Sequence, residues 1–173
     1  MSIKGISPSE LLKRVVVELP WLLVVIIALN SYSGLTAEEL SEALKLSVKV
    51  VKRAVWWLKK FKIVDEKSGK LFISKDFTKA VEELLYSYCN LGSTHVVQVD
   101  NVFIIIHVRN SRNIYYWYTR KGLYEKLLEM EKFAGTILNE SEVASLLSIP
   151  VSEAAKLIKL RRLLEKCRSS QRS

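Results

Sequence analysis

The sequence predicts a mainly α-helical protein with a small β content, in two successive parts. Three observations favour this fold class. Apolar residues recur at spacings of three and four over most of the chain, as on helices with one buried face. Turns containing glycine or asparagine separate short runs rich in valine, isoleucine and aromatic residues, as between antiparallel strands. The 173 residues are 49% hydrophobic, enough for one ordinary core or two small ones.

Four helices are expected in the first third of the chain. Ser7 precedes the first, over residues 10–19, and Pro20 opens a second, very apolar one. Thr36 and Glu39 have the spacing of a capping box, which predicts a third helix ending near residue 46. The residues of this third helix that we expect to face inward are Leu40, Ala43 and Leu44.

A hairpin and a fifth helix complete the first part. Residues 65–74 place a Lys-Ser-Gly-Lys turn between two short extended runs, which is typical of a β-hairpin. Asp76 is expected to cap the next helix. Residues 90–94 are the predicted boundary between a first domain over residues 1–90 and a second over residues 93–168. The buried face expected on the fifth helix consists of Phe77, Ala80, Val81, Leu84, Leu85 and Tyr88.

The second domain is expected to be α+β. Strands over residues 95–99, 102–109 and 114–118 would form an antiparallel meander, because turn-type sequences join them. Asn139 and Glu142 predict a second capping box. The elements expected after the meander are helices over residues 123–133, 139–148 and 152–167, and a disordered basic tail over residues 169–173.

The fourth helix, over residues 47–62, carries six lysines and arginines and no carboxylate. Placing residues about 100° apart around its axis puts the cations on one arc and the apolar side chains opposite. Like charges at these spacings repel one another, and no acid in the helix relieves the repulsion. Because the chain also has a net charge of +9, we expect a polyanionic partner. The arc consists of Lys49, Lys52, Arg53, Lys59 and Lys60, with Trp56 at its middle.

The order of these elements is that of a helix-turn-helix with a wing. Residues 35–64 (LTAEELSEALKLSVKVVKRAVWWLKKFKIV) resemble the core of the winged helix-turn-helix transcriptional regulators of archaea and bacteria, and the resemblance covers about residues 20–88. Lys62 departs from it, because such regulators usually have a glycine there. The matching features are the Leu-Thr opening, Glu39 and Leu40 in the first helix, Leu46 and Ser47 at the turn, and Val51, Val55 and Leu58 as core positions.

The resemblance implies a DNA-binding transcriptional regulator that holds duplex DNA through helix 47–62 and wing 65–74, with no cofactor. We expect a homodimer, because one such helix reads few base pairs and two half-sites multiply discrimination. Together with the basic arc, the resemblance implies a DNA interface with three parts. The major groove would receive Ser47, Lys49, Lys52 and Arg53, while the rest of the helix would contribute Trp56, Lys59 and Lys60. The wing would contact a flanking phosphate or the minor groove through Lys67, Ser68 and Lys70.

A second helix-turn-helix is one of two interpretations of the end of the chain. Residues 39–47 and 142–150 match in their apolar positions at an offset of 103. The other interpretation is a helical hairpin that packs on the meander or pairs two subunits. If the first holds, a second DNA contact would come from the cations on one side of the final helix, namely Lys156, Lys159, Arg162 and Lys166.

Two rival functions remain open. A winged-helix module can instead hold protein partners in a transcription, replication or membrane-remodelling complex, and an outward Trp56 with the aromatic run 114–118 would favour this. The same run is flanked by Arg109 and Arg112, as in proteins that stack the bases of RNA or single strands on aromatic rings.

Catalysis and membrane insertion find little support. His95 and His107 lie in strand-like apolar runs, and the sequence has no nucleophile motif, carboxylate pair, metal-ligand spacing or glycine-rich phosphate loop. We therefore expect neither an enzyme nor a metal site. The apolar stretch 15–29 is interrupted by Glu18 and Pro20, which leaves it too short to span a bilayer, so we expect a buried helix and no membrane partner.

Cysteine usage and composition give the expected compartment. Cys89 and Cys167 are far apart in the sequence and lack CxxC spacing, so we expect neither a disulfide framework nor a zinc site, and a cytoplasmic location. Two glutamines beside abundant lysine, glutamate, isoleucine and valine indicate a thermophilic, archaeal source.

Overall fold

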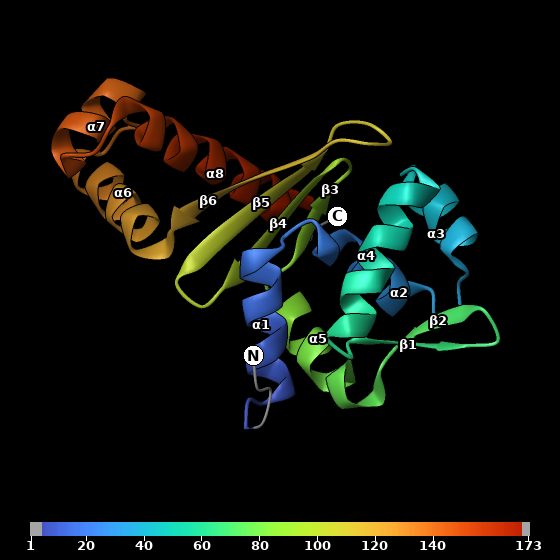
Figure 1. Ribbon diagram of the computed structural model, residues 1–173. Coiled ribbons are helices and arrows are strands. Elements are labelled where there is room, and N and C mark those ends of the chain that lie inside the picture. The colour runs from blue at the N-terminus through green and yellow to red at the C-terminus, as the bar shows by residue number, and fades with distance from the viewer. Residues whose placement is uncertain (1–4, 171–173) are drawn as a thin grey trace.

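The computed structural model describes residues 5–170, and its middle layer is a four-stranded antiparallel sheet. Helices from the first half of the chain lie on one side of this sheet and the last three helices lie on the other (Figure 1). The expectation of a mainly helical chain with a small β content is confirmed. The strands of the sheet, in spatial order, are β3 (Cys89–Leu91), β4 (Thr94–Val99), β5 (Val102–Val108) and β6 (Ile114–Arg120).

The first half of the chain forms a helical group with a small hairpin. Capping explains where its helices begin: the side chains of Ser7, Thr36 and Ser47 each accept a hydrogen bond from a backbone N–H of the first turn. The capping box predicted at Thr36 and Glu39 is confirmed. The elements are α1 (Pro8–Glu18), α2 (Leu22–Ser31), α3 (Ala37–Leu44), α4 (Val48–Lys60), β1 (Val64–Lys67), β2 (Lys70–Ile73), the 3₁₀ helix η1 (Lys75–Phe77) and α5 (Thr78–Leu85).

The hairpin β1–β2 has the predicted two-residue turn. Ser68 and Gly69 have φ values of 52° and 75°, the sign that a type I′ turn requires at both central positions. Lys62, which stands where the resembling regulators usually have a glycine, adopts the left-handed conformation itself, with φ of 58°. Its N–H donates to the carbonyl of Lys59, so α4 ends just before β1 without a glycine.

Three details of the helical prediction are wrong. α3 ends at Leu44 rather than at residue 46, because Lys45 turns left-handed with φ of 53°. Ala43 is exposed rather than inward, since the helix buries only the face that carries Leu40. Asp76 caps nothing: it lies inside η1, and α5 begins at Thr78 without a side-chain cap.

The sheet contains one strand more than predicted. Residues 90–94, expected as a domain boundary, form the turn and flanking positions of the β3–β4 hairpin, where Leu91 pairs with Thr94. The other strands agree with prediction, and β5 pairs with β4 through Val97 and Ile104 and with β6 through Ile105 and Trp117. Both sides of the expected boundary therefore contribute strands to the same sheet.

The two faces of the sheet belong to two hydrophobic cores. Ile104 and Ile106 pack with the helices of the first half, whereas Phe103 and Ile105 pack with the last three helices. This alternation is the expected result of successive side chains pointing to opposite faces of a strand. Tyr118 adds a hydrogen bond to the contact between the sheet and the helices of the first half, because its hydroxyl donates to the carbonyl of Val17 at the end of α1 at 2.7 Å.

The last three helices are α6 (Lys121–Ala134), α7 (Glu140–Leu147) and α8 (Val151–Ser170). The capping box at Asn139 and Glu142 is confirmed. α8 includes residues 169 and 170, so this part of the predicted disordered tail is helical, while residues 171–173 lie outside the described residues.

The expectation that the cysteines form no disulfide is wrong. Cys89 of β3 and Cys167 of α8 form a disulfide across a sequence separation of 78 residues. Their spacing gave no sign of this, because only the packing of α8 against β3 brings the two sulfur atoms together. Disulfides are typical of oxidising compartments and also of intracellular proteins of hyperthermophiles, so the cytoplasmic location remains a prediction. Between residues 5 and 170, none of the helices combines the length and the apolar character that a bilayer crossing requires.

Candidate nucleic-acid interface

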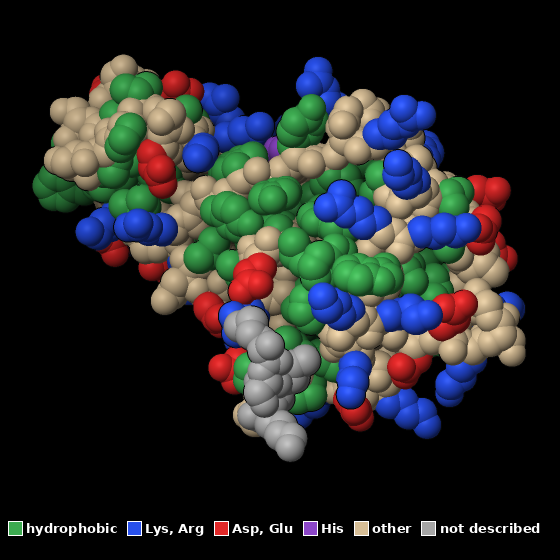
Figure 2. Space-filling view, in the orientation of Figure 1, with side chains coloured by type: hydrophobic (Ala, Val, Ile, Leu, Met, Phe, Trp, Pro, Cys, Tyr) green, Lys and Arg blue, Asp and Glu red, His purple; other side chains and the backbone are tan. Residues whose placement is uncertain are grey.

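Helix α4 presents its basic arc to solvent. Its opposite side packs into the core of the first half through Val51, Ala54, Val55 and Leu58. Figure 2 shows lysine and arginine side chains gathered over α4 and over the nearby turn of the sheet, on the face toward the viewer. The predicted arc residues Lys49, Lys52, Arg53, Trp56, Lys59 and Lys60 are all exposed.

Two carboxylates from neighbouring elements contact the arc. Lys52 lies 2.9 Å from Glu38 of α3, and Lys59 lies 2.6 Å from Glu66 of β1. The hydrogen bond from Lys52 lowers the pKa of Glu38 below its usual value. The expectation that nothing relieves the repulsion therefore holds within the helix but not in the folded protein. Both pairs are solvent-exposed, and exposed pairs contribute little stability, so a phosphate can replace either carboxylate.

Trp56 and Trp57 occupy different environments, and the predicted position of Trp56 on the exposed arc is confirmed. Trp56 is 56% exposed, whereas Trp57 is half-buried against the core. The two rings meet edge to face with centroids 4.9 Å apart. The ammonium group of Lys60 lies 5.1 Å from the Trp56 ring and 5.0 Å from the Trp57 ring, which holds this cation over the arc.

The N-terminal end of α4 contacts the turn between β5 and β6. The N–H of Ser47 donates a 2.6 Å hydrogen bond to the carbonyl of Ser111, and the Ser47 hydroxyl accepts from the N–H of Val50. Ser47 is thus occupied in holding the helix start. Arg53 leans over the Trp21 ring, with its guanidinium 5.7 Å from the ring centroid, toward this same turn.

The predicted wing residues Lys67, Ser68 and Lys70 are exposed at the end of the β1–β2 hairpin. Backbone hydrogen bonds fix β2 to the segment before α3, close to the turn of the hairpin: the N–H of Gly34 donates to the carbonyl of Leu71, and the N–H of Leu71 donates to the carbonyl of Leu35. Neither lysine forms an ion pair within residues 5–170, although the charge of Lys70 contributes to the lowered pKa of Glu39.

The helix pair α7–α8 repeats the helix pair α3–α4 in its local geometry. The capping box recurs at an offset of 103, from Thr36 to Asn139, and the left-handed residue that ends the first helix recurs from Lys45 to Ser148. The following helices α4 and α8 also begin 103 residues apart. The internal repeat is therefore structural as well as sequential.

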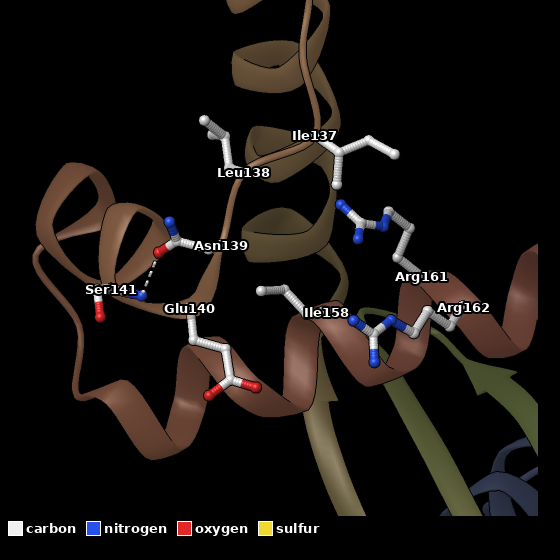
Figure 3. Close-up of a pocket in the computed structure, with 8 residues that line it drawn as sticks. All are labelled: Ile137, Leu138, Asn139, Glu140, Ser141, Ile158, Arg161 and Arg162. Atoms are coloured by element: carbon white, nitrogen blue, oxygen red, sulfur yellow. Dashed lines mark hydrogen bonds between the residues drawn. The ribbon is translucent and has the colours of Figure 1, made fainter.

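The cations of α8 are placed less favourably than those of α4. Lys156 is half-buried, and Lys159 lies over the ring of Trp117 at 5.7 Å. Arg162 lines a hollow of about 440 Å³ whose lining also includes the acidic Glu140 (Figure 3). The first turn of α8 contains Glu153 and no cation. Lys159, Arg162 and Lys166 are exposed, and Arg162 and Lys166 line a second hollow together with the acidic Glu165.

The histidines and the aromatic strand have structural partners. The indole N–H of Trp117 donates to Nε2 of His107, which leaves Nδ1 to donate to the Thr94 hydroxyl at 2.9 Å. The aromatic side chains of β6 alternate between the two faces of the sheet: Trp117 and Tyr118 pack on opposite faces, while Tyr115 and Tyr116 are exposed.

Arg112 is the functional candidate that the sequence did not assign to the DNA interface. It lies in the β5–β6 turn, far from α4 in sequence, and lines a hollow with Arg53. Its only sequence signal was its position beside the aromatic run. The described part of the chain holds no cluster of three or more His, Cys, Asp or Glu side chains arranged to bind a metal. No family model, curated protein or solved structure matches this chain.

Proposed function

We propose that this protein binds duplex DNA as a winged helix-turn-helix regulator, with α4 in the major groove and the β1–β2 hairpin as the wing. The order of α3, α4 and the hairpin supports this, because it is the order of that motif. The repeat of the turn geometry in α7 and α8 supports a helix-turn-helix interpretation of both pairs.

The observation that carries the proposal is the exposed cationic face of α4. Lys49 and Lys60 lack carboxylate partners in the described part of the chain, and Arg53 is stacked on an indole rather than paired with an acid. Cations that lie along one exposed helix face match the spacing of backbone phosphates, and their binding releases condensed counterions.

The proposal extends to a homodimer formed through the second half of the chain. Phe133 and Ile137, at and beyond the end of α6, are 97% and 70% exposed, which is unusual for large apolar side chains. Burying such side chains between two copies would give the dimer that a two-half-site regulator requires.

The test is titration of duplex DNA at several salt concentrations with a Lys49→Ala/Lys60→Ala variant. Removing two phosphate contacts should reduce the slope of log Kobs against log salt by about 1.8, since each contact contributes about 0.9. The matched control is Lys79→Ala/Lys126→Ala, which removes two exposed cations of α5 and α6 that belong neither to the α4 arc nor to the wing. Equal slopes for the two variants, or no DNA binding by the unaltered protein, would contradict the proposal.

A protein-assembly module is the second candidate, and the exposure of Trp56 favours it. Trp56 lies beside a hollow of about 550 Å³ formed with Lys52, Val55, Lys59 and Lys60. Aromatic residues in such positions dominate many protein interfaces. For an assembly module, Trp56→Ala should remove a stoichiometric copurifying protein, while DNA affinity stays absent in both forms. For a regulator, the same variant should keep the salt slope of the unaltered protein.

A further inference from the structure

A notch lies at the N-terminal end of α4, where three parts of the chain meet. Its volume is about 200 Å³. One wall comes from α4, a second from the residue before α2, and the third from the β5–β6 turn, so the notch joins the two halves of the sequence. The residues that line it are Trp21, Val50, Arg53, Arg112 and Ile114.

The β5–β6 turn is held in place beside α4. The carbonyl of Ser111 accepts the hydrogen bond from the N–H of Ser47 at 2.6 Å. Within the turn, the side-chain oxygen of Asn110 accepts from the N–H of Arg112 at 3.0 Å and from that of Asn113 at 2.9 Å. The position of Arg112 relative to α4 is therefore set by hydrogen bonds on both sides of it.

Two guanidinium groups and an apolar floor define the chemistry of the notch. Arg53 is oriented by the Trp21 ring, and Arg112 approaches from the turn. No acidic residue lines the notch, and neither arginine forms an ion pair within residues 5–170. Guanidinium groups bind phosphate oxygens in a fixed fork geometry, and the apolar floor suits the adjoining sugar.

We infer that this notch binds a backbone phosphate of nucleic acid, with Arg53 and Arg112 as its ligands and Trp21 and Ile114 against the sugar. The inference rests on the proposed DNA binding and extends it. The β5–β6 turn contacts DNA at the start of α4, whereas the wing follows the end of α4. The central sheet is thereby part of the interface, and the footprint is longer than α4 and the wing alone provide.

The decisive variant is Arg112→Ala, measured by duplex DNA titration at several salt concentrations. Loss of one phosphate contact should reduce the salt slope by about 0.9 and weaken binding to the same degree on duplexes of unrelated sequence. Thermal unfolding, measured alongside, should be unchanged, because the Arg112 side chain is exposed and has no carboxylate partner among the described residues.

The matched control is Arg109→Ala in the same turn region. Its guanidinium lies 5.8 Å from the ring of Tyr115, away from the notch, so its loss should leave the slope unchanged. Equal slopes for Arg112→Ala and the unaltered protein, or an equal reduction in Arg109→Ala, would overturn the inference even where Lys49→Ala/Lys60→Ala confirms DNA binding. Absence of DNA binding by the unaltered protein would overturn the inference and the proposed function together.

Discussion

His95 shows how one buried residue links this fold to pH. It lies on β4, only 8% exposed, with the Tyr88 hydroxyl 2.8 Å from its Nδ1 and the Tyr88 ring stacked on it. Burial lowers the pKa of His95, and the charge of His107 lowers it further. The neutral imidazole is therefore the form that the folded protein favours.

We predict that the protein loses stability as the pH falls from 7.5 to 5.5. Because the folded-state pKa of His95 is below the unfolded value of about 6.5, the unfolded chain binds more protons in this range. The contribution to stability is complete above pH 6.5 and is lost as the pH falls toward the folded-state pKa. Urea unfolding at the two pH values measures the loss.

The variant His95→Gln should show a smaller loss over the same pH range. It removes one of the two titrating groups, while His107, whose pKa burial also lowers, keeps part of the dependence. An equal loss in the variant and the unaltered protein would show that His95 does not titrate differently in the two states.

At the scale of elements, the features that depend on neighbouring residues could be predicted from the sequence. Both capping boxes, the two-residue hairpin turn and the buried side of α4 depend on residues only a few positions apart, and all were predictable. The partners of the α4 cations were not predictable, because Glu38 and Glu66 belong to other elements and meet Lys52 and Lys59 only after packing.

Strand β3 illustrates the same limit for an element. Cys89–Leu91 is three residues long and precedes a Gly-Ser turn, so its sequence suits a linker as well as a strand. It becomes a strand by pairing with the adjacent β4 through a two-residue turn, and by packing under α8, which is a long-range effect that the local sequence does not reveal. The Arg112 notch escaped prediction for this reason too, since nothing local relates the β5–β6 turn to α4.

At the scale of the whole molecule, the two halves share one sheet. The core of the first half includes Val97 and Ile104, which lie beyond the expected domain boundary, and the core of the second half includes the neighbouring Val96 and Ile105. A substitution that weakens the packing on one face of the sheet therefore also affects the strands against which the core on the other face packs. The β5–β6 turn beside α4 is fixed by the same arrangement.

The disulfide between Cys89 and Cys167 should stabilise this shared arrangement, because the loop it closes contains β4, β5, β6, α6, α7 and most of α8. The loss of chain entropy in the unfolded state predicts that the Cys89→Ser/Cys167→Ser variant is on the order of 4 kcal/mol less stable. Guanidinium chloride unfolding with and without a reductant measures this. The unaltered protein should lose stability on reduction.

The double-serine variant is also the control for that measurement, since it should unfold at the same denaturant concentration with and without reductant. An alkylating reagent added to the unaltered protein before reduction should modify neither cysteine, because both are in the disulfide. If both cysteines react without reductant, or if reduction leaves the unfolding midpoint unchanged, α8 is held on β3 by packing alone. In that case the contribution of the last three helices to the sheet rests on the apolar face that carries Phe103 and Ile105.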